Sequence, residues 1–280
     1  MFAIVIFLWA SAGFEWLALP TNAREAALAY SALPSPFFPG FISNPAGSAG
    51  DLININYTNY LAGIQYGSLS YLKSSYGGNL SYFTSGQIKK MSETGESLGY
   101  FSLSSFLLTL TAAKKVLPLI SIGSNLKLLY TTCDTFHVTG IGFDLGGILS
   151  PPRAKLGFLL KNLGFAFNPF SQEKDKFPLT IRLDGSYLIF NNLEISSGLE
   201  KFSTYPITFN LGLEGNIKDL LFLRASYSSL KNDLKISGSD LLANFAFGLS
   251  LKKSPLRLDY SFSPFPNLGN THFFSLTFTR

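Results

Sequence analysis

One cysteine and two histidines are the residues of this 280-residue chain best suited to nucleophilic or metal chemistry. Cys133 and His137 are four residues apart. In one extended strand they would share a face but stand about 13 Å apart, which is too far for a nucleophilic pair. His272 lies beside two phenylalanines, where we expect a rim residue at the start of a strand. The sequence therefore predicts no enzyme, no metal site and no cofactor.

A glycine-rich stretch, GIGFDLGGI, contains Gly140, Gly142, Gly146 and Gly147. A dinucleotide-binding loop would need a helix directly after it, but here the glycines alternate with apolar residues in a predicted strand. We interpret them as inward-facing positions that leave room for a plug. A docking notch for a ligand is the functional alternative.

Charged residues on the polar faces of the predicted strands are the most specific candidates for site residues. They are Asp144, Arg182, Asp184, Glu194, Glu200, Glu214, Arg224, Arg257 and Asp259. If the hairpin 206–230 has a three-residue loop centred on Asp219, Glu214 lies opposite Arg224. A basic residue facing lipid at the midplane costs ~2–4 kcal/mol, so we expect all nine to point inward. They form either ion pairs that stiffen the wall and hold a plug, or a polar track along a transport path.

The composition excludes several classes of protein. Only 14% of residues are charged, while Phe contributes 27 residues and Tyr 13. Beyond the N-terminus no uncharged apolar run reaches the ~18 residues of a spanning helix. The net charge of +5 comes from scattered basic residues without a dense stripe, so we expect no nucleic-acid partner. A large soluble β-protein and a transmembrane β-barrel remain.

Alternation of side chains favours the barrel. Between residues 119 and 130 one parity is apolar and the other is built of Ser, Gly, Asn and Lys, and the same split recurs in 181–189, 207–214, 221–228 and 256–263. Small polar groups on one face suit a crowded, wet interior better than an outer surface. The predicted strands also run to about 10–13 residues, which matches a spanning strand rather than the ~5–6 residues of globular sheets.

The fold class that we predict is all-β, an antiparallel up-and-down barrel of about 14 strands. The strands are expected near 51–58, 61–73, 78–90, 104–115, 118–131, 136–149, 154–162, 178–190, 192–202, 206–217, 219–230, 241–253, 255–264 and 271–280. Long connections at 91–103, 163–177, 231–240 and 265–270 each follow an odd-numbered strand, whereas short turns follow even ones. Outer-membrane barrels have this pattern of long outer loops and short periplasmic turns.

Two segments precede the barrel. Residues 1–12, MFAIVIFLWASA, have the apolar stretch and the small-x-small ending of a cleaved signal peptide, which predicts export. Residues 13–50 contain four prolines from Pro34 to Pro45 and cannot form an ordinary strand pair. We predict that 13–50 is a plug in the lumen and that 51–280 is the barrel.

Several motifs in order resemble one family. The stretch GFEWLALPTNAREAALAYSAL followed by ISNPAGSAG, then LISIGSNLKLLY with GIGFDLGGIL, FNLGLEGNIKDLLFLRASY and RLDYSFSPFPNLGNTHFFSLTF, resembles the PorV/PorQ outer-membrane proteins, which are related to FadL-type barrels. The resemblance covers nearly the whole chain after the signal. It implies a barrel of about 14 strands in the outer membrane of a Gram-negative bacterium. It also implies a plug motif made of Arg24, Asn44, Pro45, Ala46 and Gly47.

The resemblance implies a non-enzymatic accessory of type IX protein secretion or surface-protein assembly. Its partners would be outer-membrane lipid and either secretion-system proteins or exported cargo. The alternative is a FadL-like transporter with a hydrophobic small molecule as ligand, and a third interpretation is a purely structural barrel. A bulge in the wall with an apolar pocket beside the plug would favour transport. A plugged lumen without such a pocket, together with apolar loops, would favour a protein partner.

Overall fold

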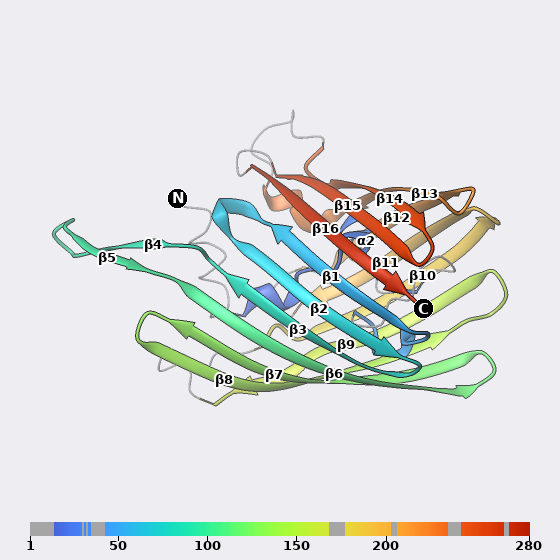
Figure 1. The fold of residues 1–280 in the computed structure, drawn as a ribbon, viewed down its shortest axis with the longest axis horizontal. Coiled ribbons are helices and arrows are strands. Elements are labelled where there is room, and N and C mark those ends of the chain that lie inside the picture. Colours follow the sequence, from blue (N-terminus) through green and yellow to red (C-terminus); the bar gives the residue numbers. More distant parts are fainter. Residues whose placement is uncertain are drawn as a thin grey trace.

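A closed antiparallel barrel forms the body of the protein (Figure 1). The computed structural model describes residues 14–29, 31, 33–34, 43–167, 177–202, 206–234, 242–265 and 269–280. The predicted signal peptide, residues 1–12, lies outside the described residues. Among the described residues, no helix is long and apolar enough to cross a bilayer.

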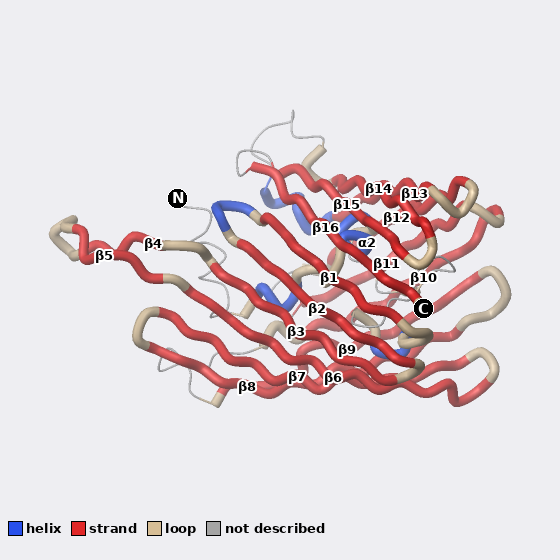
Figure 2. The backbone as a smooth tube through the Cα atoms, viewed as in Figure 1, coloured by secondary structure: helices blue, strands red, loops and turns tan. Residues whose placement is uncertain are grey.

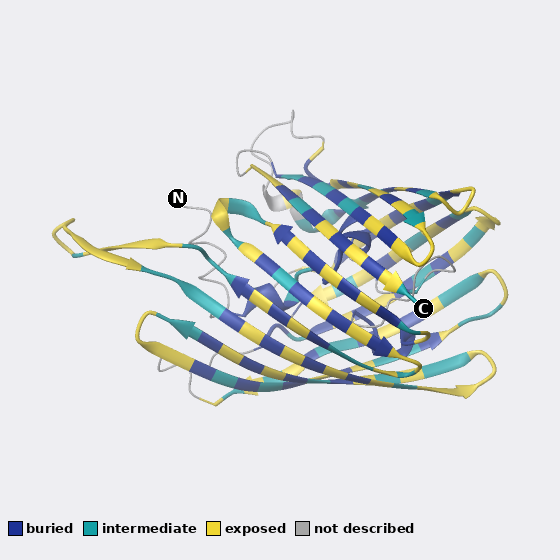
Figure 3. Cartoon of the chain, in the orientation of Figure 1, coloured by how far each residue is buried: buried dark blue, intermediate teal, exposed yellow. Residues whose placement is uncertain are grey.

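The barrel strands follow directly from the alternation in the sequence. In β1, Leu52–Asn59, buried and exposed residues alternate without a break over eight positions. Figure 3 shows the same banding of buried and exposed positions along the other strands of the wall. The exposed positions are aliphatic and aromatic, whereas most buried wall positions are Ser, Thr, Asn or charged. The barrel is thus apolar on its outside and polar on its inside, the reverse of a water-soluble protein.

The remaining strands vary in length from four to fifteen residues. They are β2 (Gln65–Lys73), β3 (Tyr76–Thr84), β4 (Ile88–Met91), β5 (Ser97–Phe101), β6 (Leu103–Leu117), β7 (Ile120–Cys133), β8 (Phe136–Leu149), β9 (Ala154–Ala166), β10 (Thr180–Phe190), β11 (Leu193–Phe202), β12 (Thr208–Ile217), β13 (Leu221–Ser228), β14 (Phe245–Lys253), β15 (Leu256–Phe265) and β16 (Gly269–Thr279).

Closure is made by the first and last strands. β1 pairs with β16 from Leu52–Thr279 to Asn59–His272, and the other side of β1 pairs with β2. Fourteen strands take part, all but β4 and β5, so the predicted antiparallel barrel of 14 strands is confirmed. Closure leaves no unpaired sheet edge, which is the condition for a β-structure in hydrocarbon.

The two ends of the barrel differ. Turns of a few residues join strands at one end, which also holds the start of β1 and the C-terminus; we call it the short-turn end. The opposite, long-loop end carries the β4–β5 hairpin, which projects away from the barrel (Figure 1). The predicted long connections 91–103, 163–177 and 231–240 lie at this end as expected. The predicted connection 265–270 is shorter, because β15 ends at Phe265 and β16 begins at Gly269, and only two residues join β7 to β8 there.

Several predicted strands have different limits in the structure: the strand predicted over 154–162 runs on to Ala166, and the one predicted over 241–253 begins at Phe245. The strand predicted over 78–90 leaves the barrel after Thr84, because Gly86 has a φ of +71° and the chain turns into the β4–β5 hairpin. The strand predicted over 61–73 begins at Gln65. Its first residues form the 3-10 turn η3, Leu61–Gly63, in which Ala62 has a φ of 55°.

The described part of the N-terminal segment lies within the barrel (Figure 2). It contains the 3-10 turn η1 (Glu15–Ala18), the short helix α2 (Ala23–Ala27) and the 3-10 turn η2 (Pro45–Gly47). The carbonyl oxygen of the Asn22 side chain accepts a hydrogen bond from the backbone N–H of Glu25, which caps α2. The fourth 3-10 element, η4 (Ser229–Leu234), follows β13 at the long-loop end.

The apolar outer face predicts a cost for charge that depends on depth. Leu183, in β10, and Leu220, in the short turn before β13, are both 54% exposed. We expect Leu183→Arg to lower the free energy of unfolding in bilayers by about 2–4 kcal/mol and Leu220→Arg by about 0–1 kcal/mol. Chemical denaturation of both variants in vesicles measures the difference. Equal costs at the two positions would contradict a lipid-facing outer wall.

Candidate functional site

Glu214 is the centre of an ion-pair network inside the barrel. The β12–β13 register sets it opposite Arg224, as the predicted three-residue loop around Asp219 requires. The Nε of Arg224 donates to Glu214 Oε1 at 2.7 Å, and its Nη1 lies 3.1 Å from Asp259 Oδ1. Arg257 donates from Nε to the same Asp259 carboxylate at 3.0 Å. The network thus ties β12, β13 and β15 together on their inner faces.

Arg24 joins the N-terminal segment to this network. Its Nη2 donates to Glu214 Oε2 at 2.7 Å, and its Nη1 donates to the carbonyl oxygen of Leu33 at 3.2 Å. Burial acts to lower the pKa of Arg24, but the Glu214 carboxylate together with Glu194 and Glu25 outweighs it, so the pKa is raised above its ordinary value. The guanidinium therefore stays charged, and its removal from the network would break a fully buried ion pair.

A second network ties the segment to β10 and β11. Arg182 donates from Nε to both oxygens of Asp184 at 2.9 Å and from Nη1 to Glu200 Oε2 at 3.1 Å. Its Nη2 also donates to the carbonyl oxygen of Ala29, just beyond α2, at 3.4 Å. In the first network Arg24 therefore reaches from the segment to the wall, and in the second network Arg182 reaches from the wall to the segment.

A third network builds a bulge in β9. The register shifts between Phe143 and Leu145, so that Lys161 and Asn162 both oppose Asp144. Asn162 has a φ of 63°, a left-handed conformation that Asn adopts more readily than most residues. Its backbone N–H donates to Asp144 Oδ1 at 2.8 Å. The buried carboxylate thus holds the extra residue of the bulge in place.

Lys127 completes this third network. Its Nζ lies 2.8 Å from Asp144 Oδ1 and donates to Asn162 Oδ1 at 2.6 Å. The Asn162 amide in turn donates to the carbonyl oxygen of Pro178, just before β10. Alternation along the sequence predicts Lys127 on the polar face of its strand but assigns it no role. The feature of the sequence that could have revealed it is a basic residue at an inward-facing position with no acidic residue directly opposite on either neighbouring strand.

The structure places all nine candidate charges on the inner side of the wall. Eight are buried, and the Glu200 side chain is 12% exposed. The Oε2 of Glu194 has no hydrogen-bond partner among the described residues. Glu194 lines a cavity of about 10 Å³ together with Arg24, Ser186 and Ser196, which is room for about one water.

The Asn-Pro-Ala-Gly stretch lies in a notch lined by glycines. A Cβ on Gly123 would stand 2.4 Å from the backbone carbon of Pro45, and one on Gly146 would stand 2.1 Å from Asn44 Oδ1. Asn44 Nδ2 donates to the carbonyl oxygen of Phe158 at 3.3 Å. Pro45, Ala46 and Gly47 are all buried. Only glycine at these wall positions lets the segment approach so closely.

An apolar compartment fills the interior at the long-loop end. It joins residues of the segment to five neighbouring strands and to the residue Phe177, and its buried members are Phe14, Trp16, Leu17, Tyr66, Phe83, Leu107, Leu129, Val138 and Phe177. Phe14 meets Phe177 edge to face with 5.4 Å between ring centroids, and Trp16 stacks on Phe83 at 5.3 Å. We call this set the apolar compartment. Periodicity did not predict it, because it interrupts the polar inner face with apolar residues.

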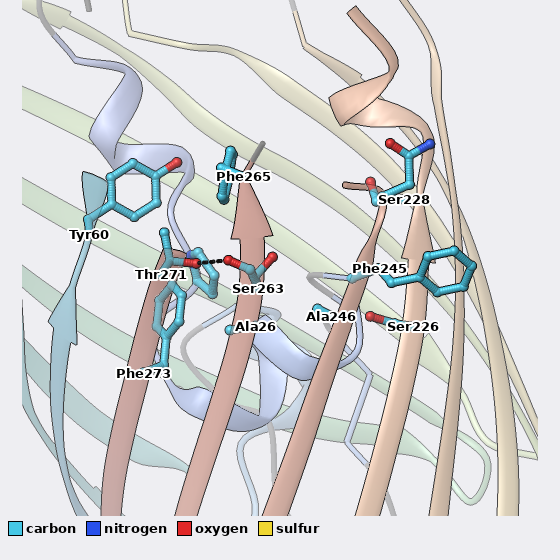
Figure 4. Close-up of a pocket in the computed structure, with 13 residues that line it drawn as sticks. Ala26, Tyr60, Ser226, Ser228, Phe245, Ala246, Ser263, Phe265, Thr271 and Phe273 are labelled. Carbon is cyan, nitrogen blue, oxygen red and sulfur yellow. Dashed lines mark hydrogen bonds between the residues drawn. The ribbon is translucent and has the colours of Figure 1, made fainter. Parts of the chain in front are cut away.

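A small cavity lies between α2 and β13–β16 (Figure 4). It has a volume of about 20 Å³ and is lined by phenylalanines, Tyr60, small residues and polar groups. The Ser226 hydroxyl and Asn244 Oδ1 are buried at its wall without a partner among the described residues. The volume and these polar atoms suit a water rather than a hydrocarbon.

Reactive side chains do not assemble into a catalytic centre in the described part of the chain. The expected strand geometry of Cys133 and His137 is wrong, because β7 ends at Cys133 and His137 lies in β8 opposite Thr132. Partners across a ladder share a face, so Cys133 and His137 lie on opposite faces. His272 accepts or donates a hydrogen bond with the Tyr260 hydroxyl at 2.9 Å. No group of three metal-binding residues occurs among the described residues.

A closed barrel of 14 strands with a polar, filled interior and an apolar outer face is the architecture of an outer-membrane protein. Three solved structures share the fold. A FadL homologue of Pseudomonas aeruginosa superposes with a TM-score of 0.58 and 12% identity over 92% of this chain and 98% of that chain. The monoaromatic hydrocarbon channel CymD gives 0.61 and 12% over 96% and 99%. The toluene transporter TodX of Pseudomonas putida gives 0.59 and 10% over 94% and 98%.

At this level of identity the likeness shows the fold alone. No protein-family model matches the chain, and a search of curated protein sequences finds no match. The structural neighbours support the FadL-type part of the expected resemblance. They give no support to the expected PorV/PorQ assignment.

Burial predicts unequal costs for breaking two ion pairs. Arg24 and Glu214 are 3% and 2% exposed, whereas Lys90 and Asp134, a pair outside the barrel, are 45% and 34% exposed. We expect Arg24→Ala to lower the free energy of unfolding by about 3–5 kcal/mol and Lys90→Ala by about 0–1 kcal/mol. Denaturation curves of the two variants test this. Similar losses in both would show that the Arg24 pair does not anchor the segment.

Proposed function

We propose that this chain is an outer-membrane channel that passes hydrophobic small molecules from the outside into the barrel wall and the bilayer. The observation that carries the proposal is the apolar compartment inside an otherwise polar lumen, beside the bulge in β9. The neighbours described as a hydrocarbon channel and a toluene transporter support the same class of ligand. Localisation in the outer membrane and export by residues 1–12 are part of the proposal.

The bulge marks a discontinuity in the wall. The β9–β10 ladder ends at the pair Lys161–Thr180, while β9 continues beside β8 as far as Ala166. Phe177, which follows β9 and precedes β10, belongs to the apolar compartment and packs against Gly140 and Gly142. The compartment therefore reaches the place where the β9–β10 ladder ends, and we propose this place as the route of an apolar molecule toward the lipid.

The compartment is occupied by residues that can be replaced. Phe14, Trp16 and Leu17 belong to the N-terminal segment and not to the wall. The indole Nε1 of Trp16 is buried without a hydrogen-bond partner in the described part of the chain, a defect that costs about 1–3 kcal/mol. A hydrocarbon has no such group to satisfy. Release of Trp16 would recover the cost of its unpaired N–H, so we propose that an apolar ligand takes the place of this side chain in the compartment.

A protein partner is the second candidate, as an accessory of type IX secretion or surface assembly. The β4–β5 hairpin supports it, because Ile88, Met91, Leu98 and Tyr100 are 37–66% exposed on a two-stranded sheet outside the barrel. Secretion-system proteins or exported cargo would be the partners. The hairpin and the small size of the two described cavities, about 20 and 10 Å³, support this function, whereas the compartment and the bulge together support transport.

Uptake measurement tests the channel directly. Cells that lack their own hydrocarbon channels and express this chain should accumulate radiolabelled toluene faster than cells with an empty vector. Uptake equal to the vector control would contradict the channel. If a secretion translocon or exported cargo also co-purifies with the chain, the second candidate, a secretion or surface-assembly accessory, would be the function.

Two changes at Lys161 distinguish the effect of the bulge from the effect of the lysine side chain. Removing Lys161 restores one residue opposite Asp144 and should lengthen the β9–β10 ladder, so we expect most of the toluene uptake to be lost. Lys161→Ala is the matched control, since it keeps the bulge and removes only the side chain. It should retain uptake. Loss of uptake in both variants, or in neither, would exclude the bulge as the route.

A further inference from the structure

Basic residues encircle the short-turn end of the barrel. Seven positions exist around this rim, six turns and the paired termini, and six of them carry a basic side chain. These eight residues, which we call the basic rim, are Lys73, Lys114, Lys115, Arg153, Lys218, Lys252, Lys253 and Arg280. Seven are exposed and Lys252 is half-buried. Only two acidic side chains, Asp51 and Asp219, accompany them in the described rim.

Two acidic side chains stand against eight basic ones, so the rim keeps a net positive charge. Asp51 Oδ1 accepts the backbone N–H of Ser74, and Asp219 Oδ1 accepts from the Asn216 amide in its own turn. Arg153 donates to the carbonyl oxygens of Leu188 and Ile189, which hold its guanidinium in place without cancelling its charge. Most of the positive charge of the rim therefore faces outward.

The opposite end has no such excess among the described residues. There Lys89, Lys90 and Lys201 are accompanied by Glu93, Glu96 and Asp134, and Lys90 pairs with Asp134. The charge asymmetry thus belongs to one end of the barrel and is not a general property of a basic protein.

Apolar side chains share the turns with the basic ones. The β6–β7 turn follows Lys114 and Lys115 with Val116, Leu117 and Leu119, which are 43–57% exposed. Next to Lys218, the side chain of Leu220 is 54% exposed. This mixture is typical of residues at a membrane interface, where apolar groups enter the acyl boundary and lysines reach the headgroups.

We infer that the basic rim binds the headgroups of anionic glycerophospholipids, such as phosphatidylglycerol, in the leaflet at the short-turn end. The rim runs from turn to turn around one end of the barrel and is not a compact patch, so it fits a layer of lipid phosphates better than a single acidic protein. The inference rests on the membrane placement in the proposed function. It adds that the lipid around this end is selected by charge.

Spin-labelled lipids test the inference. The full barrel is reconstituted in phosphatidylcholine bilayers with a trace of spin-labelled phosphatidylglycerol or phosphatidylcholine, and the motionally restricted fraction of each is measured. We expect the barrel to favour phosphatidylglycerol by at least about twofold at low salt. The preference should fall toward one at about 1 M salt, where charges are screened beyond ~3 Å.

Two charge variants provide the comparison. Combined replacement of Lys114, Lys115, Lys252 and Lys253 by Gln should abolish most of the preference. Replacement of Lys89, Lys90 and Lys201 by Gln, at the other end, should leave it unchanged. The salt series on the unaltered protein remains a test if the fourfold variant does not insert.

A phosphatidylglycerol-to-phosphatidylcholine preference near one at low salt would overturn the inference. An acidic protein would then be the better candidate for the partner of the rim. An equal loss in both variants would overturn it as well, because the effect would then follow net charge and not the rim. This measurement contains no toluene or other transported ligand. A negative result would therefore count against the lipid inference alone, and a loss of toluene uptake would count against the proposed channel.

Discussion

Pairing of every backbone N–H and C=O is the constraint on which this structure depends. Hydrocarbon offers no partner to these groups, so a sheet in the bilayer has to close on itself. The β1–β16 ladder closes it here, over eight residue pairs from Leu52–Thr279 to Asn59–His272. Closure fixes one face of every strand toward lipid and the other toward the lumen, and the sequence follows that division along the whole wall.

A barrel of this width then has an interior that must be filled. Part of the filling is polar: Arg24, Arg182 and Lys127 each lie in a network of buried carboxylates and amides. Such networks contribute little net stability, but each is costly to break. The Arg24 and Arg182 networks fix the position of the segment, whereas the Lys127 network holds the bulge in β9. The remaining part is the apolar compartment, where only packing holds Phe14 and Trp16. The segment is therefore held firmly at Arg24 and weakly at its first residues.

Local patterns predicted the wall well. Alternation located the strands, and a three-residue turn was enough to set Glu214 opposite Arg224. Contacts between distant parts of the chain could not be read in this way. Arg24 and Glu214 are 190 residues apart, and no periodicity links them. The bulge at Asn162 depends on the register with Asp144 in another strand, and the departure of the chain at Gly86 depends on one φ angle.

The direction in which the side chains of one strand point is the central claim, and spin-label accessibility along β10 measures it most directly. Nitroxides placed singly from Ile181 to Ile189 in bilayer-reconstituted protein are exposed to oxygen, which concentrates in lipid, and to a water-soluble nickel complex. High oxygen collision rates at 181, 183, 187 and 189, with low rates for both reagents at 182, 184 and 186, are the predicted result. High nickel-complex rates at 181, 183 and 187 would show that these apolar side chains face water, and would contradict the account.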